Sequence, residues 1–342
     1  MAEYKNLPDF DSLPTVEGVP HCSWGLFDKD GKKDVLGCIN LLTPEVVKEA
    51  YKEARDGVSI SLNWPLGALA QPGFARKGIE HKPFNAFKDH GIHCFDDEIA
   101  FNTQSSSQWD GLVHFAHQGS GLNYNGAKAT EENLLQHFGE SDTEKTLPSL
   151  NHWLDRGGLV GRGILLDYKE YAAAKGIKYS PFENHTITIE DLEAVAKHQG
   201  TEFKFGDILL VRTGFTDDLG SASAEEQAQL LSTHQAVGVA GCKATACWVW
   251  NHHFAGVASD NIGFEVCPPA IEEENNRVGS LAELVLHQYF LSGFGLNIGE
   301  LWDRKALGEH CKKVGRYEFL LSSCPLNVWG SVASPPNALA MF

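Results

Sequence analysis

The sequence has few of the features that mark membrane, redox or nucleic-acid-binding proteins. No apolar run approaches the roughly 20 residues that a membrane-spanning helix needs. The eight cysteines are scattered without a Cys-x-x-Cys pair, so we expect free thiols rather than a zinc finger or a redox centre. No Lys/Arg cluster offsets the net charge of −17, which repels phosphate backbones and anionic lipid. These absences argue against nucleic-acid and membrane roles.

Signatures of two common enzyme classes are also missing. No Gly-x-Ser-x-Gly elbow occurs, which argues against serine-hydrolase chemistry. The run Gly119-Ser-Gly121 lacks the Gly-Lys-Ser/Thr of a phosphate loop. The first residues are polar and acidic, which indicates no secretory signal, and we expect a cytoplasmic protein.

Strand and helix patterns alternate along the 342 residues, which predicts an α/β fold with a mixed sheet. Thr43-Pro44-Glu45 is a strong helix start, and we expect that helix to reach about residue 56. Capping patterns begin further helices at Thr188 and Ser280. Short helices are expected over 131–138, 147–154 and 168–175, and strands over 58–62, 163–167, 206–214, 247–250, 256–260 and 317–321.

Two regions interrupt this pattern. Proline-rich, acidic residues near the start predict an extended N-terminal arm over 1–36, followed by a single domain over 37–342. Residues 64–97 are predicted to form a loop rich in proline, glycine and histidine, which either covers a pocket or is a surface insertion.

The stretch 102–125 combines polar and large apolar residues in an unusual way. Gln104, Gln108, Asp110 and His114 are interspersed with Trp109 and other apolar residues. This alternation indicates a strand or tight bend with one face in the core and one lining a pocket. Gln108 and Asp110 share a face, whereas Gln104, about 20 Å away in an extended chain, can join them only if residues 105–107 bend.

The same stretch resembles the signature of the cyclase / kynurenine formamidase-like superfamily of metal-dependent hydrolases. That signature reads His-x-Gly-Thr-His-x-Asp-x-Pro-x-His. Gln104 and Gln108 stand at its first two histidines, Asp110 matches the aspartate, and His114 matches the last histidine. The variant Gln-Trp-Asp-Gly-Leu-x-His is similar to that of a sub-branch described only as "cyclase family", and similar segments extend from about residue 37 to 328.

The resemblance implies a swivelling β/β/α domain with a metal site. It implies that Gln104, Gln108 and Asp110 stand at ligand positions and that His114 transfers protons. In the family a helical His and a Glu about a dozen residues later complete the metal site, and His287 and Glu300 match them. A His on an apolar helix face is otherwise more often a core residue than a ligand.

The ligand set leaves two alternatives for the cofactor. Two amides, two carboxylates and one imidazole suit Mn²⁺, Mg²⁺ or Ca²⁺ better than Zn²⁺, and a single Mn²⁺ is the favoured interpretation. In the other alternative no metal binds, Gln104 and Gln108 hydrogen-bond the substrate or Asp110, and His114 acts as the acid or base.

The functional hypothesis is a metal-dependent hydrolase that cleaves a C–N or C–O bond of a small cyclic or aromatic amide, lactam or ester. Asp110 would bridge metal and water, His114 would move the proton, and Trp109, Trp64 and Gln104 would contact the substrate. Phe115 is more simply explained as core. The alternatives are a metal-independent cyclase, dehydratase or isomerase, or an inactive binding homologue. The resemblance also implies a homodimer or homotetramer.

Overall fold

The computed structural model describes residues 4, 6–85, 87–135, 147–271 and 277–342. Its centre is a nine-stranded sheet in the order β1-β15-β13-β5-β7-β9-β12-β4-β14. Four neighbouring strands run parallel, namely β5 (Leu159–Asp167), β7 (Ile208–Arg212), β9 (Gly256–Ser259) and β12 (Ile298–Glu300). The other pairings in this sheet are antiparallel, so the predicted α/β class with a mixed sheet is confirmed.

Antiparallel strands extend the parallel block on both sides. On one side lie β13 (Glu318–Ser323), β15 (Ala338–Met341) and β1 (Ser59–Ser61), and on the other lie β4 (Gln108–Asp110) and β14 (Ala333–Ser334). Two small sheets accompany it, made of β6 (Thr186–Ile187) with β8 (Gly238–Val239) and of β10 (Ala270–Ile271) with β11 (Arg277–Val278).

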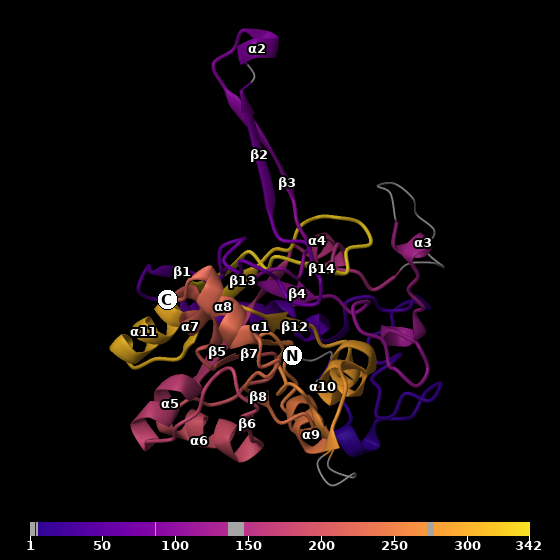
Figure 1. The fold of residues 1–342 in the computed structure, drawn as a ribbon. Coiled ribbons are helices and arrows are strands. Elements are labelled where there is room, and N and C mark those ends of the chain that lie inside the picture. The colour runs from indigo at the N-terminus through magenta and orange to yellow at the C-terminus, as the bar shows by residue number, and fades with distance from the viewer. Residues whose placement is uncertain (1–3, 5, 86, 136–146, 272–276) are drawn as a thin grey trace.

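Helices flank the large sheet (Figure 1). They are α1 (Pro44–Ala50), α3 (Glu131–Leu134), α4 (His152–Asp155), α5 (Tyr168–Lys175), α6 (Ile189–Gln199), α7 (Phe215–Gly220), α8 (Ala224–Leu231), α9 (Lys243–Asn251), α10 (Val285–His287) and α11 (Lys305–Val314). A π-helical segment, η7 (Gln288–Phe294), continues α10, and 3₁₀ turns are η1 (Phe10–Ser12), η2 (Gly37–Leu41), η3 (Tyr51–Glu53), η4 (Tyr124–Gly126) and η6 (Leu281–Glu283). No helix in the described ranges has the length and apolar character that crossing a bilayer requires.

Two of the three predicted helix starts are confirmed by their caps, whereas the capping box at Ser280 begins the 3₁₀ turn η6 and α10 starts only at Val285. The Thr43 hydroxyl accepts a hydrogen bond from the backbone N–H of Val46 at the start of α1. A reciprocal capping box joins Thr188 and Asp191 at the start of α6. These contacts satisfy backbone donors that the first helical turn leaves without intrahelical partners.

Several element predictions were wrong. Residues 247–250 form part of α9 and not a strand, since a short apolar run with Trp and Val fits either structure. The first helix ends at Ala50 and continues only as η3 to Glu53. Of the two short helices expected next, α3 ends at Leu134 and α4 spans His152–Asp155, and residues 136–138 lie outside the described residues.

The N-terminal residues pack against the body of the chain. The Phe10 side chain is buried in the main core, and its backbone N–H donates to Asn251 Oδ1 at 2.8 Å. The indole of Trp250 donates to the carbonyl of Pro8, also at 2.8 Å. Both partners lie at the end of α9, so this segment covers that helix.

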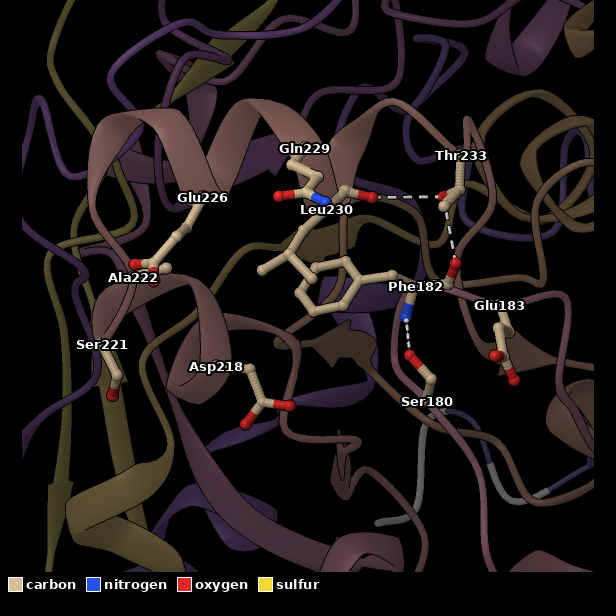
Figure 2. A pocket seen from close by; sticks show the side chains of 10 residues that line it. All are labelled: Ser180, Phe182, Glu183, Asp218, Ser221, Ala222, Glu226, Gln229, Leu230 and Thr233. Carbon is tan, nitrogen blue, oxygen red and sulfur yellow. Dashed lines mark hydrogen bonds between the residues drawn. The ribbon is translucent and has the colours of Figure 1, made fainter.

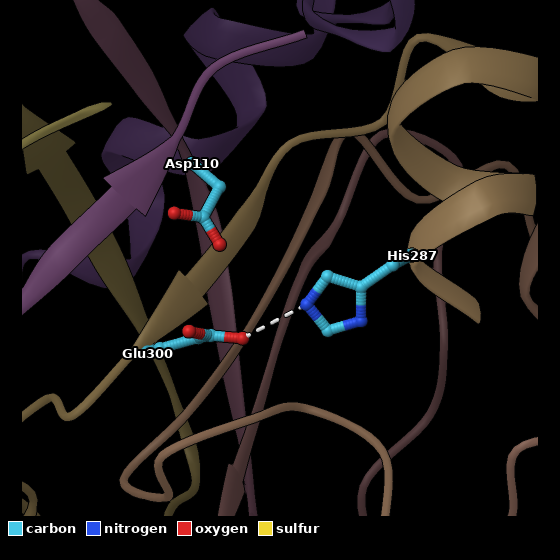
Figure 3. Close-up of side chains that lie close together, drawn as sticks. All are labelled: Asp110, His287 and Glu300. Atoms are coloured by element: carbon cyan, nitrogen blue, oxygen red, sulfur yellow. Dashed lines mark ion pairs between the residues drawn. The ribbon is translucent and has the colours of Figure 1, made fainter. Parts of the chain in front are cut away.

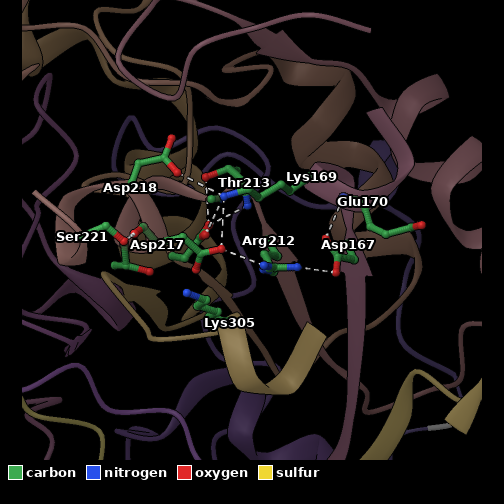
Figure 4. Close-up of polar contacts among 12 residues, drawn as sticks. Asp167, Lys169, Glu170, Arg212, Thr213, Asp217, Asp218, Ser221 and Lys305 are labelled. Atoms are coloured by element: carbon green, nitrogen blue, oxygen red, sulfur yellow. Dashed lines mark hydrogen bonds and ion pairs between the residues drawn. The ribbon is translucent and has the colours of Figure 1, made fainter. Parts of the chain in front are cut away.

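A cluster of ion pairs fixes the carboxyl ends of two central strands (Figure 4). Arg212, at the end of β7, donates to Asp167 at 2.8 Å and to Asp217 at 2.7 Å. Lys169 lies 3.1 Å from Asp217, and Asp260 accepts hydrogen bonds from the backbone of Thr213 at 2.7 Å. The cluster ties β5 and β7 to the start of α7 and therefore stabilises this end of the sheet.

The predicted loop over 64–97 is instead largely a projecting hairpin. Strands β2 (Glu80–Asn85) and β3 (Phe95–Ala100), with α2 (Phe87–His90) at the tip, stand away from the body (Figure 1). Every residue of both strands is exposed. The backbone N–H of Asn102 donates to the carbonyl of Lys77 at 2.9 Å and closes the base of this arm.

Because the strands of this arm bury nothing against its own chain, we expect its removal to leave the fold stable. Replacement of residues 79–100 by two glycines should change Tm by less than about 2 °C, since exposed surface residues contribute little to the free energy of unfolding. Differential scanning calorimetry measures this directly. A loss above about 5 °C would contradict the prediction and would indicate that the arm packs on another molecule, as the homodimer or homotetramer prediction allows.

Candidate functional site

The bend predicted at residues 105–107 is present and leads directly into β4. Beyond it, Gln108 and Asp110 share one face of the strand, with Gln108 Nε2 at 3.3 Å from Asp110 Oδ1. The bend brings Gln104 to the same point, where its Nε2 donates to Asp110 Oδ1 at 2.8 Å. Two amides therefore converge on one fully buried carboxylate.

The register between β4 and β12 adds a second carboxylate. Glu300 lies directly opposite Gln108, and Ile298 lies opposite Asp110. Gln108 Nε2 donates to Glu300 Oε2 at 2.9 Å. Side chains that face each other across paired strands share a face, so the two acids lie on the same side of the sheet.

His287 reaches the same place from α10. Its Nε2 lies 3.3 Å from Glu300 Oε1. Asp110, Glu300 and His287 each offer a ligand atom, and these three atoms lie within 4.8 Å of one another (Figure 3). The fold thus joins Asp110 to two residues that lie far from it in the sequence, in one buried cluster.

Glu265 holds His287 in place and was missed by the sequence reasoning. Its fully buried carboxylate accepts hydrogen bonds from the backbone N–H groups of Val285, Leu286 and His287 at 2.9, 3.1 and 2.9 Å. It also lies 2.9 Å from His287 Nδ1. The only sequence signal was an acid placed between two apolar residues, Phe264 and Val266.

The contact with Glu265 fixes the orientation of the His287 imidazole. A histidine that binds a metal through one ring nitrogen usually gives the other to a carboxylate or carbonyl. Here Nδ1 faces Glu265 and Nε2 faces the cluster of Asp110 and Glu300. His287 therefore has the orientation of a ligand.

His114 lies beside the cluster rather than in it. Its backbone N–H donates to the carbonyl of Gly111 at 2.9 Å, and this turn brings the side chain back toward Asp110. Gln104 Nε2 lies 3.1 Å from His114 Nε2 and so bridges His114 to Asp110. Burial lowers the pKa of His114, although Asp110 opposes the shift, so the imidazole is neutral at neutral pH.

The pKa shifts in the cluster reflect the burial of several charges together. Burial and the nearby Asp110 charge raise the pKa of Glu300 above that of an ordinary glutamate. Burial alone would lower the pKa of His287, but its contacts with Glu265 and Glu300 outweigh burial and raise it. The imidazolium is thus the cation that balances these carboxylates.

A cavity of about 270 Å³ opens onto the cluster. Its polar lining comes from Arg76, His114, Glu265, His287 and Glu300. Its apolar lining comes from Phe74, Phe115, Gly263, Ile262, Cys267, Leu281 and Leu284. Phe115, expected in the core, lies at the cavity with its ring centroid 5.4 Å from that of His287. Because Phe74 and Arg76 line the cavity, the region 64–97, predicted either to cover a pocket or to be a surface insertion, contributes to a pocket.

The two tryptophans predicted to contact substrate do not line this cavity. Trp109 is fully buried and packs against Trp153 and Trp302, with ring centroids at 5.3 and 4.9 Å. It lies between Gln108 and Asp110 on a strand, and alternation directs it to the opposite face. Trp64 is buried in a second apolar cluster with Phe182. The structure therefore gives no support to substrate contact by either ring.

A larger hollow of about 610 Å³ lies elsewhere, between α7, α8 and residues 180–183 (Figure 2). The acidic side chains of Glu183, Asp218 and Glu226 line it. None of the predicted site residues borders it, and it is an open groove without buried converging groups. The smaller cavity, with its buried titratable groups, is the better candidate for chemistry.

The cluster fits a divalent cation by the chemistry of its donors. Among the described residues, Asp110 Oδ2 and Gln108 Oε1 are buried oxygens without a hydrogen-bond partner, and Glu300 Oε1 has only the 3.3 Å ion-pair contact with His287 Nε2. Carboxylate and amide oxygens are ligands for hard cations, and His287 adds one imidazole nitrogen. Buried oxygens left without donors are costly unless a cation, water or proton satisfies them.

A family model covers much of the chain. The model of a family described as "Putative cyclase" matches residues 42–266. The chain belongs to this cyclase family. A comparison with curated proteins gives no match.

Solved structures share the cyclase-family fold. A crystal structure of a novel cyclase aligns with a TM-score of 0.76 and 28% identity over 94% of this chain and 99% of the other. Isatin hydrolase A from Ralstonia solanacearum aligns with a TM-score of 0.54 and 13% identity. The alignment covers 83% of this chain and 91% of the hydrolase. Isatin hydrolase A from Labrenzia aggregata, bound to benzyl benzoate, aligns with a TM-score of 0.54 and 12% identity. The alignment covers 86% of this chain and 97% of the hydrolase. At these low identities, the two isatin hydrolases show only that this chain has the same fold as they have.

Glu265 is expected to be essential for the stability of the site. In Glu265→Ala the three backbone N–H groups at the start of α10 lose their acceptor, and an unsatisfied buried donor costs about 1–3 kcal/mol. We predict a loss of at least about 3 kcal/mol in the free energy of unfolding, measured by urea denaturation. Glu309→Ala, an exposed glutamate on α11, is the control and should stay within about 0.5 kcal/mol of the wild type. Equal stability of the two variants would refute the assigned contacts.

Proposed function

We propose that this cyclase-family chain is a metal-dependent hydrolase of a small cyclic or aromatic amide, lactam or ester. The observation that carries the proposal is the convergence of Asp110, His287 and Glu300 at a small, mostly apolar cavity. The names of the isatin hydrolases with the same fold support hydrolysis as the reaction type.

Asp110, Glu300 and His287 would hold the metal, with Gln108 offering a further oxygen. A bound divalent cation would polarise the substrate carbonyl and make a water molecule more acidic. Because oxygen donors outnumber nitrogen in this set, Mn²⁺ is favoured over Zn²⁺.

The protein's own groups supply proton transfer and orientation. His114 is neutral, lines the cavity and lies within hydrogen-bond distance of Gln104. A neutral imidazole can accept a proton from water and return it to a leaving nitrogen or oxygen. Gln104 also donates to Asp110, so it fixes His114 relative to the carboxylate. Apolar residues such as Phe115 and Leu284 exclude bulk water from this proton path.

A metal-independent cyclase, dehydratase or isomerase is the second candidate, and a specific observation favours it. The amide nitrogens of Gln104 and Gln108 donate to the two carboxylates, as they would if hydrogen bonds replaced metal coordination. The His287 imidazolium would then supply the positive charge of the site. His114 would still act as the acid or base.

Metal analysis separates the two candidates. Wild-type protein, expressed with added Mn²⁺ and Zn²⁺ and then desalted, should retain about one equivalent of a divalent metal by plasma mass spectrometry. Glu300→Ala should lose it, because the substitution removes one of the three close ligands, while the surface control Glu309→Ala should retain it. Turnover of a lactam or ester by metal-free wild-type protein would exclude the metal-dependent hydrolase.

His114→Ala tests the assigned proton transfer. Because general acid–base catalysis contributes about 10²–10⁴-fold, we expect kcat to fall by that factor on a lactam or aryl ester that the wild type hydrolyses. Metal content should be unchanged, since His114 lies outside the triad. His117→Ala, which alters a nearby histidine paired with Ser120, is the matched control. Full activity of His114→Ala would remove this residue from the mechanism.

A further inference from the structure

Arg76 is the only lysine or arginine among the residues described as lining the cavity. One guanidinium nitrogen donates to the carbonyl of Gln104 at 3.2 Å, and the guanidinium lies 4.9 Å from the Phe74 ring centroid. No ion pair joins Arg76 to a carboxylate in the described part of the chain, although its neighbour Lys77 pairs with Glu80. A guanidinium has five N–H donors, and the Gln104 carbonyl is the one hydrogen-bond acceptor that this guanidinium has among the described residues. Its charge is also near enough to oppose the rise that burial causes in the pKa of Glu300.

The backbone around Arg76 is held in an unusual conformation. Phe74 and Ala75 both have left-handed φ values of 60° and 55°, which non-glycine residues rarely adopt in succession. The backbone N–H of Arg76 donates to the carbonyl of Gly73 at 3.2 Å and closes this turn. Such strain is found where a ligand-binding group must be presented in a fixed direction. Here the turn presents Phe74 and Arg76 to one cavity.

The apolar part of the cavity lining determines the size and polarity of the ligand that fits. Phe74, Phe115, Ile262 and Leu284 give the cavity a largely apolar lining. Its volume of about 270 Å³ lies near the lower end of small-molecule sites, so it fits a molecule with one or two rings. His287 and Glu300 of the triad line the same cavity as Arg76, so a ligand in it can contact both.

We propose that Arg76 binds a carboxylate of the ligand, and that the site therefore selects aromatic acids over their neutral analogues. A planar guanidinium matches a carboxylate in a bidentate geometry, and the largely apolar lining of the cavity strengthens that contact. The role of this contact in turnover rests on the proposed hydrolase function. Hydrolysis adds the hydroxyl of water to the carbonyl carbon and a proton to the leaving nitrogen or oxygen, so the product itself carries a new carboxylate.

The test compares benzoate with benzamide, two probes of almost equal shape that differ in charge. Isothermal titration calorimetry of the protein as purified should give benzoate an affinity at least tenfold higher than that of benzamide. Arg76→Gln should abolish this preference, with benzamide affinity unchanged. Arg76→Lys should retain part of it, because the charge remains but the bidentate fork is lost. Lys77→Gln removes a neighbouring surface charge outside the cavity lining and should bind benzoate like the wild type.

Three results would overturn the proposal. They are failure of the wild type to bind benzoate, equal affinity for the two probes, or an undiminished preference in Arg76→Gln. Thermal unfolding of each variant shows whether the fold is retained, and Arg76→Lys gives a second measurement if Arg76→Gln unfolds. The test measures binding without turnover, so a protein that prefers benzoate but hydrolyses nothing would refute the proposed function and leave this inference intact.

Discussion

The pairing of β4 with β12 is the constraint on which the site depends. It places Glu300 opposite Gln108 and brings Asp110 onto the same face of the sheet. A slip of one residue would turn Glu300 to the opposite face, where Trp109 packs in the core. The two strands are only three residues long, so their register needs outside support. Asn297 supplies some of it by donating to the carbonyl of Asp110 at 2.9 Å.

Buried charge is the second constraint. Asp110, Glu265 and Glu300 are three buried carboxylates around one imidazole. Burying a charge without a partner is costly, and His287 can balance only part of this set. Glu265 is satisfied by the start of α10, whereas Asp110 Oδ2 has no donor among the described residues and Glu300 Oε1 contacts only His287. The folded chain thus maintains a negative centre that a cation or a proton would stabilise.

Much of this arrangement could be predicted from the sequence because it is local or because strand alternation fixes it. The common face of Gln108 and Asp110 follows from spacing alone, whereas the bend after Gln104 was a condition for Gln104 to join them. Alternation also places Trp109 in the core, so the prediction that it contacts substrate went against the same rule. Glu265 and Arg76 could not be predicted in this way, since their roles depend on a helix start and a strained turn that meet the site only in three dimensions.

The two glutamine amides beside the carboxylate pair give the site its particular character. An imidazole nitrogen can ligate a metal or carry a proton, whereas a glutamine amide can only donate through nitrogen or accept through oxygen. In the present arrangement the nitrogens of Gln104 and Gln108 hold Asp110 and Glu300 in position. Rotation of the Gln108 amide would present oxygen to the same space, and amide orientation follows the surrounding donors and acceptors. The same two glutamines support a carboxylate pair in this structure, and a bound cation would favour the orientation that completes an oxygen-rich shell.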